Sequence, residues 1–206
     1  MWSPRPLRVR TETDTDRVAM TAVVRRDVVP ASVLAMLLAV SVEVMFFAGL
    51  ISAFTIARAG AGAGHWTTPA DPLLPAASTL GNTAALLLSG LCMAAAHVQY
   101  RRRSPAAGRT ILAAWVLGAL FVVLQGREWV GLLSQGLTMH SSGLGAFFYL
   151  IVGAHGVHAV VALAALLVAW WRLTMGGLTP AFLFGVETFW YFVVLLWPVI
   201  YLRVYF

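Results

Sequence analysis

Residues 32–54 read SVLAMLLAVSVEVMFFAGLISAF, a run of 23 residues whose single charged group is Glu43. A membrane-spanning helix needs about 20 mostly apolar residues, so this run predicts a transmembrane helix. Four further apolar segments of similar length follow it. The five predicted spans are residues 31–57, 78–99, 110–134, 144–171 and 181–204. The sequence therefore predicts an all-α fold, a polytopic membrane protein built as a five-helix bundle.

The composition supports a membrane protein. The chain has 60% hydrophobic and only 11% charged residues, whereas a soluble globular domain is about half apolar and about a quarter charged. All 14 basic residues are arginines, and the net charge is +6. Most of these arginines lie in the N-terminal segment and the loops, so their sign informs topology and predicts no nucleic-acid partner. The single cysteine, Cys92, excludes an internal disulfide.

Arginine placement predicts the orientation in the membrane. Arginines precede the first span and lie between spans two and three and between spans four and five. They include Arg17, Arg25, Arg26, Arg101, Arg102, Arg103, Arg109 and Arg172. The other two loops carry only Arg58, at a margin. The positive-inside rule therefore places the N-terminus in the cytoplasm and the C-terminus outside. We expect residues 1–29 to form a flexible cytoplasmic tail and residues 30–206 to form the membrane domain.

Buried carboxylates are the first indication of function. An ionised group at mid-bilayer is costly, so it usually faces the bundle interior and marks a functional position. Glu43 lies about 12 residues into its span, or ~18 Å, near the middle of a core about 30 Å thick. His155 falls at a similar depth in the fourth span, and His158 lies one turn deeper. We expect Glu43 to pair with His155 directly or through water. A proton-linked or lipid-linked role and a neutral, hydrogen-bonded glutamate remain open.

The other polar groups of the spans are predicted to be structural. Arg127 and Glu128 are adjacent and lie near the outer end of the third span with Gln125. We expect them, with Asn82 of the second span, to anchor the helices or to pair with loops or another subunit. Glu187 lies near the inner end of the fifth span and is expected to reach the interface.

The histidines do not predict a cofactor site. A bis-histidine haem needs ligands from facing helices at matched depth, but His97 lies near a helix end and His155 near the midplane. His155 and His158 lie on one helix and cannot sandwich a haem, and further metal ligands are missing. No hydrolytic triad, phosphate-binding loop or catalytic carboxylate pair is present in the sequence. The sequence therefore predicts no catalytic residue, no cofactor and no metal in this chain.

Several short strings, in order, resemble subunit III of the haem–copper oxidases (cytochrome c oxidase subunit 3). From residue 35 to the C-terminus they are EVMFF at 43–47, Pro75, NT at 82–83, LSG at 88–90, LQ at 124–125, EW at 128–129, SGxGxFFY at 142–149 and GxHGxH at 153–158. The ending FWYFVVLLW at 189–197 is similar to the family's Tyr-Trp-His-Phe-Val-Asp-Val-Val-Trp, but Tyr191 replaces the histidine and Val194 the aspartate. The resemblance is to the short, five-helix form.

The resemblance implies a subunit without a redox centre. Subunit I, its main contact, would carry the haems and copper, and subunit II would admit electrons. The chain would bind phospholipid, stabilise subunit I and support proton uptake. Glu43 matches the family's carbodiimide-reactive glutamate, and with His155 and His158 it would line an internal polar or lipid-facing site. Arg101, Arg102, Arg103 and Arg109 would contact lipid phosphates or partners.

The resemblance places the chain in a bacterial plasma membrane and leaves three alternatives open. An accessory protein of a nitric oxide reductase is compatible with the altered C-terminal motif. A small proton-linked transporter would use Glu43 alone, although the inverted repeats common in transporters are not seen. A haem-bearing membrane anchor would be recognised by its absorbance.

Overall fold

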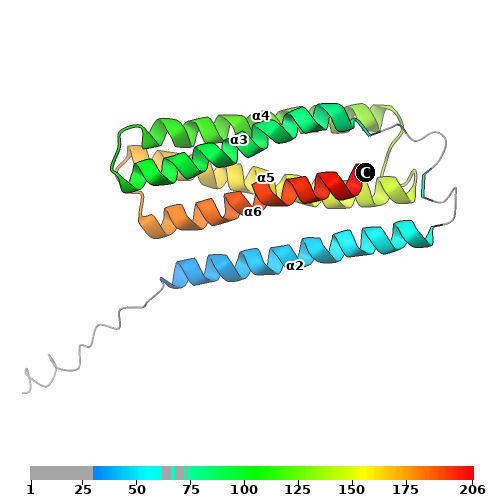
Figure 1. Cartoon of the computed structure of the whole chain (residues 1–206), viewed down its shortest axis with the longest axis horizontal. Coiled ribbons are helices and arrows are strands. Elements are labelled where there is room, and N and C mark those ends of the chain that lie inside the picture. Colours follow the sequence, from blue (N-terminus) through cyan, green and yellow to red (C-terminus); the bar gives the residue numbers. More distant parts are fainter. Residues whose placement is uncertain (1–29, 62–65, 68–71, 73) are drawn as a thin grey trace, which may run out of the picture. The chain divides into compact units, whose positions relative to one another are not determined.

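The structure is a computed structural model that describes residues 30–61, 66–67, 72 and 74–206. Its five helices are α2 (Ala31–Gly60), α3 (Ala76–Arg101), α4 (Ala107–Ser134), α5 (Gly143–Thr174) and α6 (Pro180–Val204) (Figure 1). Each has 25 to 32 residues and is long and apolar enough to cross a membrane. The predicted all-α architecture with five spans is confirmed. The expected N-terminal tail, residues 1–29, lies outside the described residues.

Helix α6 lies at the centre of the bundle. It contacts α2, α3 and α5, while α3 and α4 form the most extensive pair. Helix α2 packs only on α5 and α6 among the described helices, and Figure 1 shows it along one side of the bundle. Large apolar side chains of α2 therefore point outward, including Leu38, Met45 and Ile56, which are 60%, 74% and 72% exposed. Such a surface suits lipid or a neighbouring membrane subunit rather than water.

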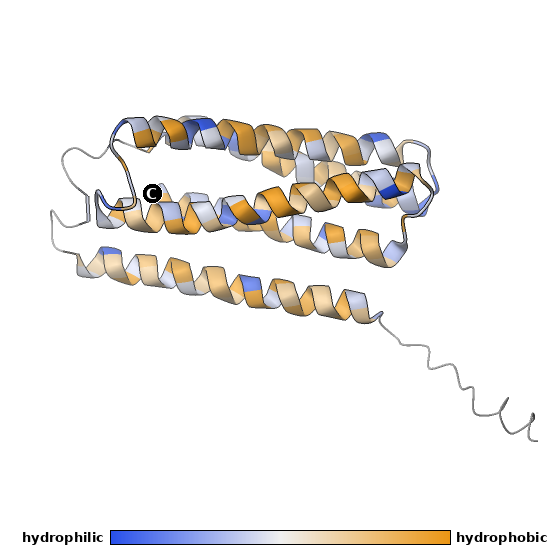
Figure 2. Ribbon diagram, turned by 180° about the vertical axis from the view of Figure 1, so that it is seen from behind, coloured by the Kyte–Doolittle hydropathy of each residue, from blue (hydrophilic) through white to orange (hydrophobic). Residues whose placement is uncertain are grey.

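Hydropathy follows the same pattern over the whole molecule. Figure 2 shows hydrophobic residues along the length of every helix, interrupted by single hydrophilic residues. Lipid cannot hydrogen-bond the backbone, so continuous helices satisfy the N–H and C=O groups internally. The few polar side chains within the spans are the candidates for function.

Two tryptophans of α6 form the centre of the core. Trp190 and Trp197 are completely buried. The indole N–H of Trp197 donates to the Thr83 hydroxyl of α3 at 2.9 Å, and its ring meets Phe121 of α4 edge-on. The ring of Trp190 reaches α4 at Gly118, where an added Cβ would lie 2.5 Å from its Cη2 atom. The lack of a side chain at Gly118 therefore lets this indole pack between the helices.

Side-chain caps set the beginnings of α5 and α6. The Ser142 hydroxyl accepts a hydrogen bond from the Gly145 N–H at 3.1 Å, and the Thr179 hydroxyl accepts from the Phe182 N–H. Pro180 occupies the first turn of α6, where its missing N–H has no helical partner to lose.

Exposed arginines cluster at one end of the bundle. Successive helices run antiparallel, so α3 and α5 end where α4 and α6 begin, at the left of Figure 1. We call this end the arginine face. Its members are Arg101, Arg102, Arg103, Arg109 and Arg172, and all five side chains are exposed.

Candidate functional site

A carboxylate–imidazole pair joins α2 to α5 at mid-helix. Glu43 lies near the middle of α2 and His158 at the middle of α5. Their Oε2 and Nε2 atoms are 3.1 Å apart, and the side chains are 34% and 20% exposed. The pair therefore lies on the side of the bundle at the depth where a bilayer is most apolar. A charged group left alone there would be costly, so the contact has a clear electrostatic reason.

The hydrogen bonding of His158 fixes how the pair carries its proton. Its Nδ1 atom lies 2.7 Å from the carbonyl oxygen of Ala154. A carbonyl oxygen only accepts, so Nδ1 carries a hydrogen, and Nε2 is bare in the neutral ring. The contact with Glu43 then requires a proton between the two groups, held as a carboxylic acid or as an imidazolium facing a carboxylate. In both forms the pair holds one exchangeable proton and has no net charge.

Aromatic rings surround the imidazole of His158. The ring centroids of Phe47, Phe192 and Phe189 lie 5.4, 6.0 and 6.2 Å from it. Phe47 is completely buried and also lies near the ring of His155, with centroids 6.4 Å apart. Apolar walls reduce the local dielectric screening and so strengthen the interaction between Glu43 and His158.

His155 does not contact Glu43, so the expected direct pairing of these two residues is wrong. The His155 ring is 1% exposed and lies beside Trp197, with centroids 5.2 Å apart. Neither of its nitrogens has a hydrogen-bond partner among the described residues. Residues three apart on an α-helix differ by about 60° in direction. That rotation points His155 into the bundle and leaves His158 to reach α2.

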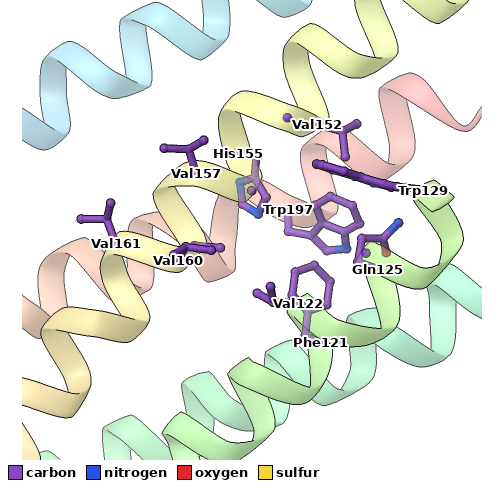
Figure 3. A pocket seen from close by; sticks show the side chains of 14 residues that line it. Phe121, Val122, Gln125, Trp129, Val152, His155, Val157, Val160, Val161 and Trp197 are labelled. Carbon is purple, nitrogen blue, oxygen red and sulfur yellow. The ribbon is translucent and has the colours of Figure 1, made fainter. Parts of the chain in front are cut away.

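His155 lines a groove between α4 and α5 of about 350 Å³. Figure 3 shows its ring beside Trp197, with Gln125 and Phe121 of α4 across the space and Val157 and Val160 along α5. The lining is almost entirely apolar, so the groove offers space to hydrocarbon rather than to a charged solute.

A second carboxylate–imidazole pair joins α3 to α6. The Nδ1 atom of His97 lies 2.7 Å from Oε2 of Glu187, whose side chain is buried. The expectation that Glu187 reaches the interface is therefore wrong, because His97 binds its carboxylate within the bundle. The sequence carried a usable signal for this pair. His97 lies four residues before the end of α3 and Glu187 seven after the start of α6, at the same end of the bundle.

The third carboxylate, Glu128, joins three helical segments through hydrogen bonds. It accepts from the Thr79 hydroxyl at 2.7 Å and from the amides of Asn82 and Gln125 at 3.0 Å each. Gln125 also donates to the hydroxyl of Tyr205 at 3.1 Å. Asn82, Gln125 and Glu128 are thus brought together, whereas the adjacent Arg127 is exposed. This network links α3, α4 and the C-terminal end of the chain.

The described residues contain no group of three or more His, Cys, Asp or Glu side chains positioned to hold a metal ion. The two carboxylate–imidazole pairs lie on different helix pairs, α2–α5 and α3–α6. Each pair links two helices through a carboxylate–imidazole contact.

Comparison with known proteins identifies the family to which this chain belongs. The profile described as "Cytochrome c oxidase subunit III" matches residues 19–206. The chain belongs to the cytochrome c oxidase subunit III family. It is therefore a multi-pass membrane protein and a subunit III of a haem–copper oxidase complex, in a family whose members are non-catalytic subunits. Family membership favours this function over the nitric oxide reductase accessory protein and the small transporter.

Curated members of the subunit III family match most of the chain. A "Probable cytochrome c oxidase subunit 3" of Mycobacterium leprae is 34% identical over 81% of this chain and 83% of the relative. A "Cytochrome c oxidase subunit 3" of Corynebacterium diphtheriae is 32% identical with the same coverage. The human "Cytochrome c oxidase subunit 3" is 31% identical over 82% of this chain and 67% of the human protein.

The two departures from the subunit III C-terminal motif have a structural account. Val194 is buried, and its Cγ1 atom lies 3.0 Å from the position that a Cβ of Gly90 would occupy. A small residue on α3 and an apolar residue on α6 thus form a close apolar contact. Tyr191 is partly exposed and lines a groove of about 500 Å³ with Val40 and Val44 of α2.

Proposed function

We propose that this chain is subunit III of a respiratory terminal oxidase in a bacterial plasma membrane. In that complex it packs against subunit I, which carries the haems and copper, and also meets subunit II. It stabilises subunit I and supports proton uptake while oxygen is reduced and protons are translocated. The observation that carries this proposal is the pair formed by Glu43 and His158.

The pair supports a proton-linked role through its charge balance. One proton is shared between Glu43 and His158, so the site remains neutral toward lipid while the proton is exchangeable. Removing the proton would place a bare carboxylate at mid-membrane against an imidazole nitrogen lone pair, which is unfavourable. The site therefore favours retention of one proton and its delivery only to a neighbouring acceptor. His155 lies near the same Phe47 ring, with centroids 6.4 Å apart, and has no contact with Glu43.

The arginine face supports a cytoplasmic placement of that end of the bundle. Positively charged loop residues favour the cytoplasmic side, so the N-terminus lies inside and the C-terminus outside. There Arg101, Arg102, Arg103 and Arg109 would meet anionic lipid phosphates or partner subunits. Residues 1–29 form a cytoplasmic tail ahead of the membrane domain in this proposal.

Purification of the tagged chain from native membranes in a gentle detergent tests the proposed function. We expect a haem–copper subunit I to co-elute and a reduced-minus-oxidised spectrum of the eluate to show its haem bands. Elution of a colourless chain alone would overturn the proposal and would favour the alternative of a small proton-linked transporter. Haem bands from the chain alone would indicate a haem-bearing anchor instead.

A further inference from the structure

A second, more polar cavity opens at the arginine face, between the end of α3 and the start of α6. Its volume is about 650 Å³. The residues that line it are His97, Tyr100, Arg101, Arg103, Pro180, Leu183 and Phe184. We call this cavity the arginine pocket. It is separate from the Glu43–His158 pair, which joins α2 to α5.

The rim of the arginine pocket is strongly positive. Within the described part of the chain, no carboxylate lies within 4 Å of Arg101 or Arg103. The three described glutamates are all engaged elsewhere: Glu43 with His158, Glu187 with His97, and Glu128 in its own network. The N-terminal end of α6 also reaches the pocket through Pro180, and the helix dipole adds partial positive charge there. The rim therefore favours an anion.

A turn at the end of α3 carries the two arginines that line the rim. Arg103 has a positive φ of 54°, and its N–H donates to the carbonyl of Tyr100 at 3.0 Å. Tyr100 in turn donates its hydroxyl hydrogen to the carbonyl of Leu178, just before α6, at 2.8 Å. These bonds tie the end of α3 to the α5–α6 connection, so the pocket is held by the fold on both sides.

Below the rim, the wall of the arginine pocket is apolar. Leu183 is buried, and Phe184 is 38% exposed on the first turns of α6. Phe184 lies on the membrane-spanning part of the helix, where hydrocarbon is the natural neighbour. A positive rim at the membrane surface above an apolar wall matches a molecule with an anionic head and acyl chains. A soluble anion would make no use of Phe184.

We propose that the arginine pocket binds an anionic phospholipid, with its phosphate between Arg101 and Arg103 and an acyl chain along Phe184. Guanidinium groups suit phosphate because their N–H donors form paired hydrogen bonds to its oxygens. This site rests on the proposed function, in which the arginine face contacts lipid. It specifies the lipid class, the pocket and the two arginines that bind the phosphate. Arg102 and Arg109 do not line the pocket and therefore have no part in this site.

Native mass spectrometry of the full chain in a non-ionic detergent tests the proposal. Phosphatidylglycerol, phosphatidylcholine and sodium phosphate are titrated separately. We expect saturable binding of one phosphatidylglycerol, weakened about fivefold by Arg101→Gln or Arg103→Gln alone and about thirtyfold by both together. Arg102→Gln is the matched control, since it removes one charge from the same exposed turn, and its affinity should match that of the wild type. Phe184→Ser should also weaken binding of phosphatidylglycerol, because it removes the apolar wall proposed to contact an acyl chain.

Three results would overturn the phospholipid site. They are equal weakening by Arg102→Gln, equal affinity for phosphatidylcholine, and displacement of the lipid by millimolar phosphate. Salt provides a test on the unaltered chain, because raising ionic strength should weaken phosphatidylglycerol binding and leave phosphatidylcholine binding unchanged. Co-purification with subunit I is scored separately, so failure of the lipid site and failure of the proposed function are distinguishable.

Discussion

At the scale of single residues, each carboxylate of the described spans has its own form of compensation. Glu43 shares a proton with His158, Glu187 meets His97, and Glu128 accepts three neutral hydrogen bonds. These differences predict different consequences of substitution. A carboxylate that shares a proton at the lipid-facing side is suited to function, whereas one that is buried between helices affects stability first.

Glu43→Gln should separate proton handling from folding. The amide can donate to the bare Nε2 of His158, so the free energy of unfolding should change by no more than about 1 kcal/mol. The exchangeable proton is lost, so proton uptake during turnover should fall. Proton uptake and the lifetime of the purified oxidase during turnover are the measurements, with Ser41→Ala on the same helix as control. A Glu43→Gln oxidase that pumps protons and survives turnover like the wild type would contradict the proton role.

His97→Leu should destabilise the bundle. It leaves the buried Glu187 without its partner, and a buried polar group left unsatisfied in this way costs about 1–3 kcal/mol. Glu187→Gln should cost less, because an amide oxygen still accepts from His97. The loss in His97→Leu should shrink as pH falls, since a protonated Glu187 carries no charge. Unfolding in detergent at several pH values measures this, with the exposed His140→Ala as control. Equal stability of His97→Leu and His140→Ala would refute a structural role for the pair.

At the scale of helices, packing depends on where side chains are absent. Trp190 extends from α6 to α4 over Gly118, and Val194 lies against Gly90 of α3. Small residues let helices and large rings approach closely, which is a main source of association energy in lipid. Helix α2 has few such contacts, since it buries only Phe47 and Phe54. It is therefore the least firmly held helix of the bundle within the described chain.

Gly118→Ala should weaken the contact between α4 and α6. The new methyl group would overlap the Trp190 ring, and overpacking of this kind costs about 1–3 kcal/mol. Gly126→Ala on the same helix meets nothing within 4 Å and is the matched control. It should be neutral or stabilising by about 0.5–1 kcal/mol, because alanine favours helices over glycine. Unfolding in detergent measures both variants, and a Gly118→Ala protein as stable as Gly126→Ala would contradict this packing argument.

At the scale of the whole molecule, the arginine face gives the bundle a direction. The five arginines gather at one end, whereas only Arg58, Arg127 and Arg203 lie toward the other end among the described residues. By the positive-inside rule, this asymmetry predicts that the arginine face is cytoplasmic and meets anionic lipid there.

Single-cysteine labelling tests this direction in intact cells. With Cys92→Ser as background, Pro105→Cys reports the arginine face and Met139→Cys the opposite end; both positions are exposed. A membrane-impermeant maleimide should label Met139→Cys in intact cells and Pro105→Cys only after permeabilisation. The background without added cysteine is the control. Labelling of Pro105→Cys from outside would reverse the proposed topology.

The five spans, the family resemblance and the distribution of arginines could be predicted without a structure, because hydropathy and charge are local properties of the chain. The partner of each carboxylate, in contrast, could be identified only from the packing of the helices. Glu43 meets His158 rather than His155, and Glu187 is buried against His97. Depth along a helix can be counted from the sequence, but the direction of a side chain depends on the rotation of each helix. That rotation is fixed by contacts between distant segments, such as Phe47 against α5 and α6, and by Trp190 over Gly118.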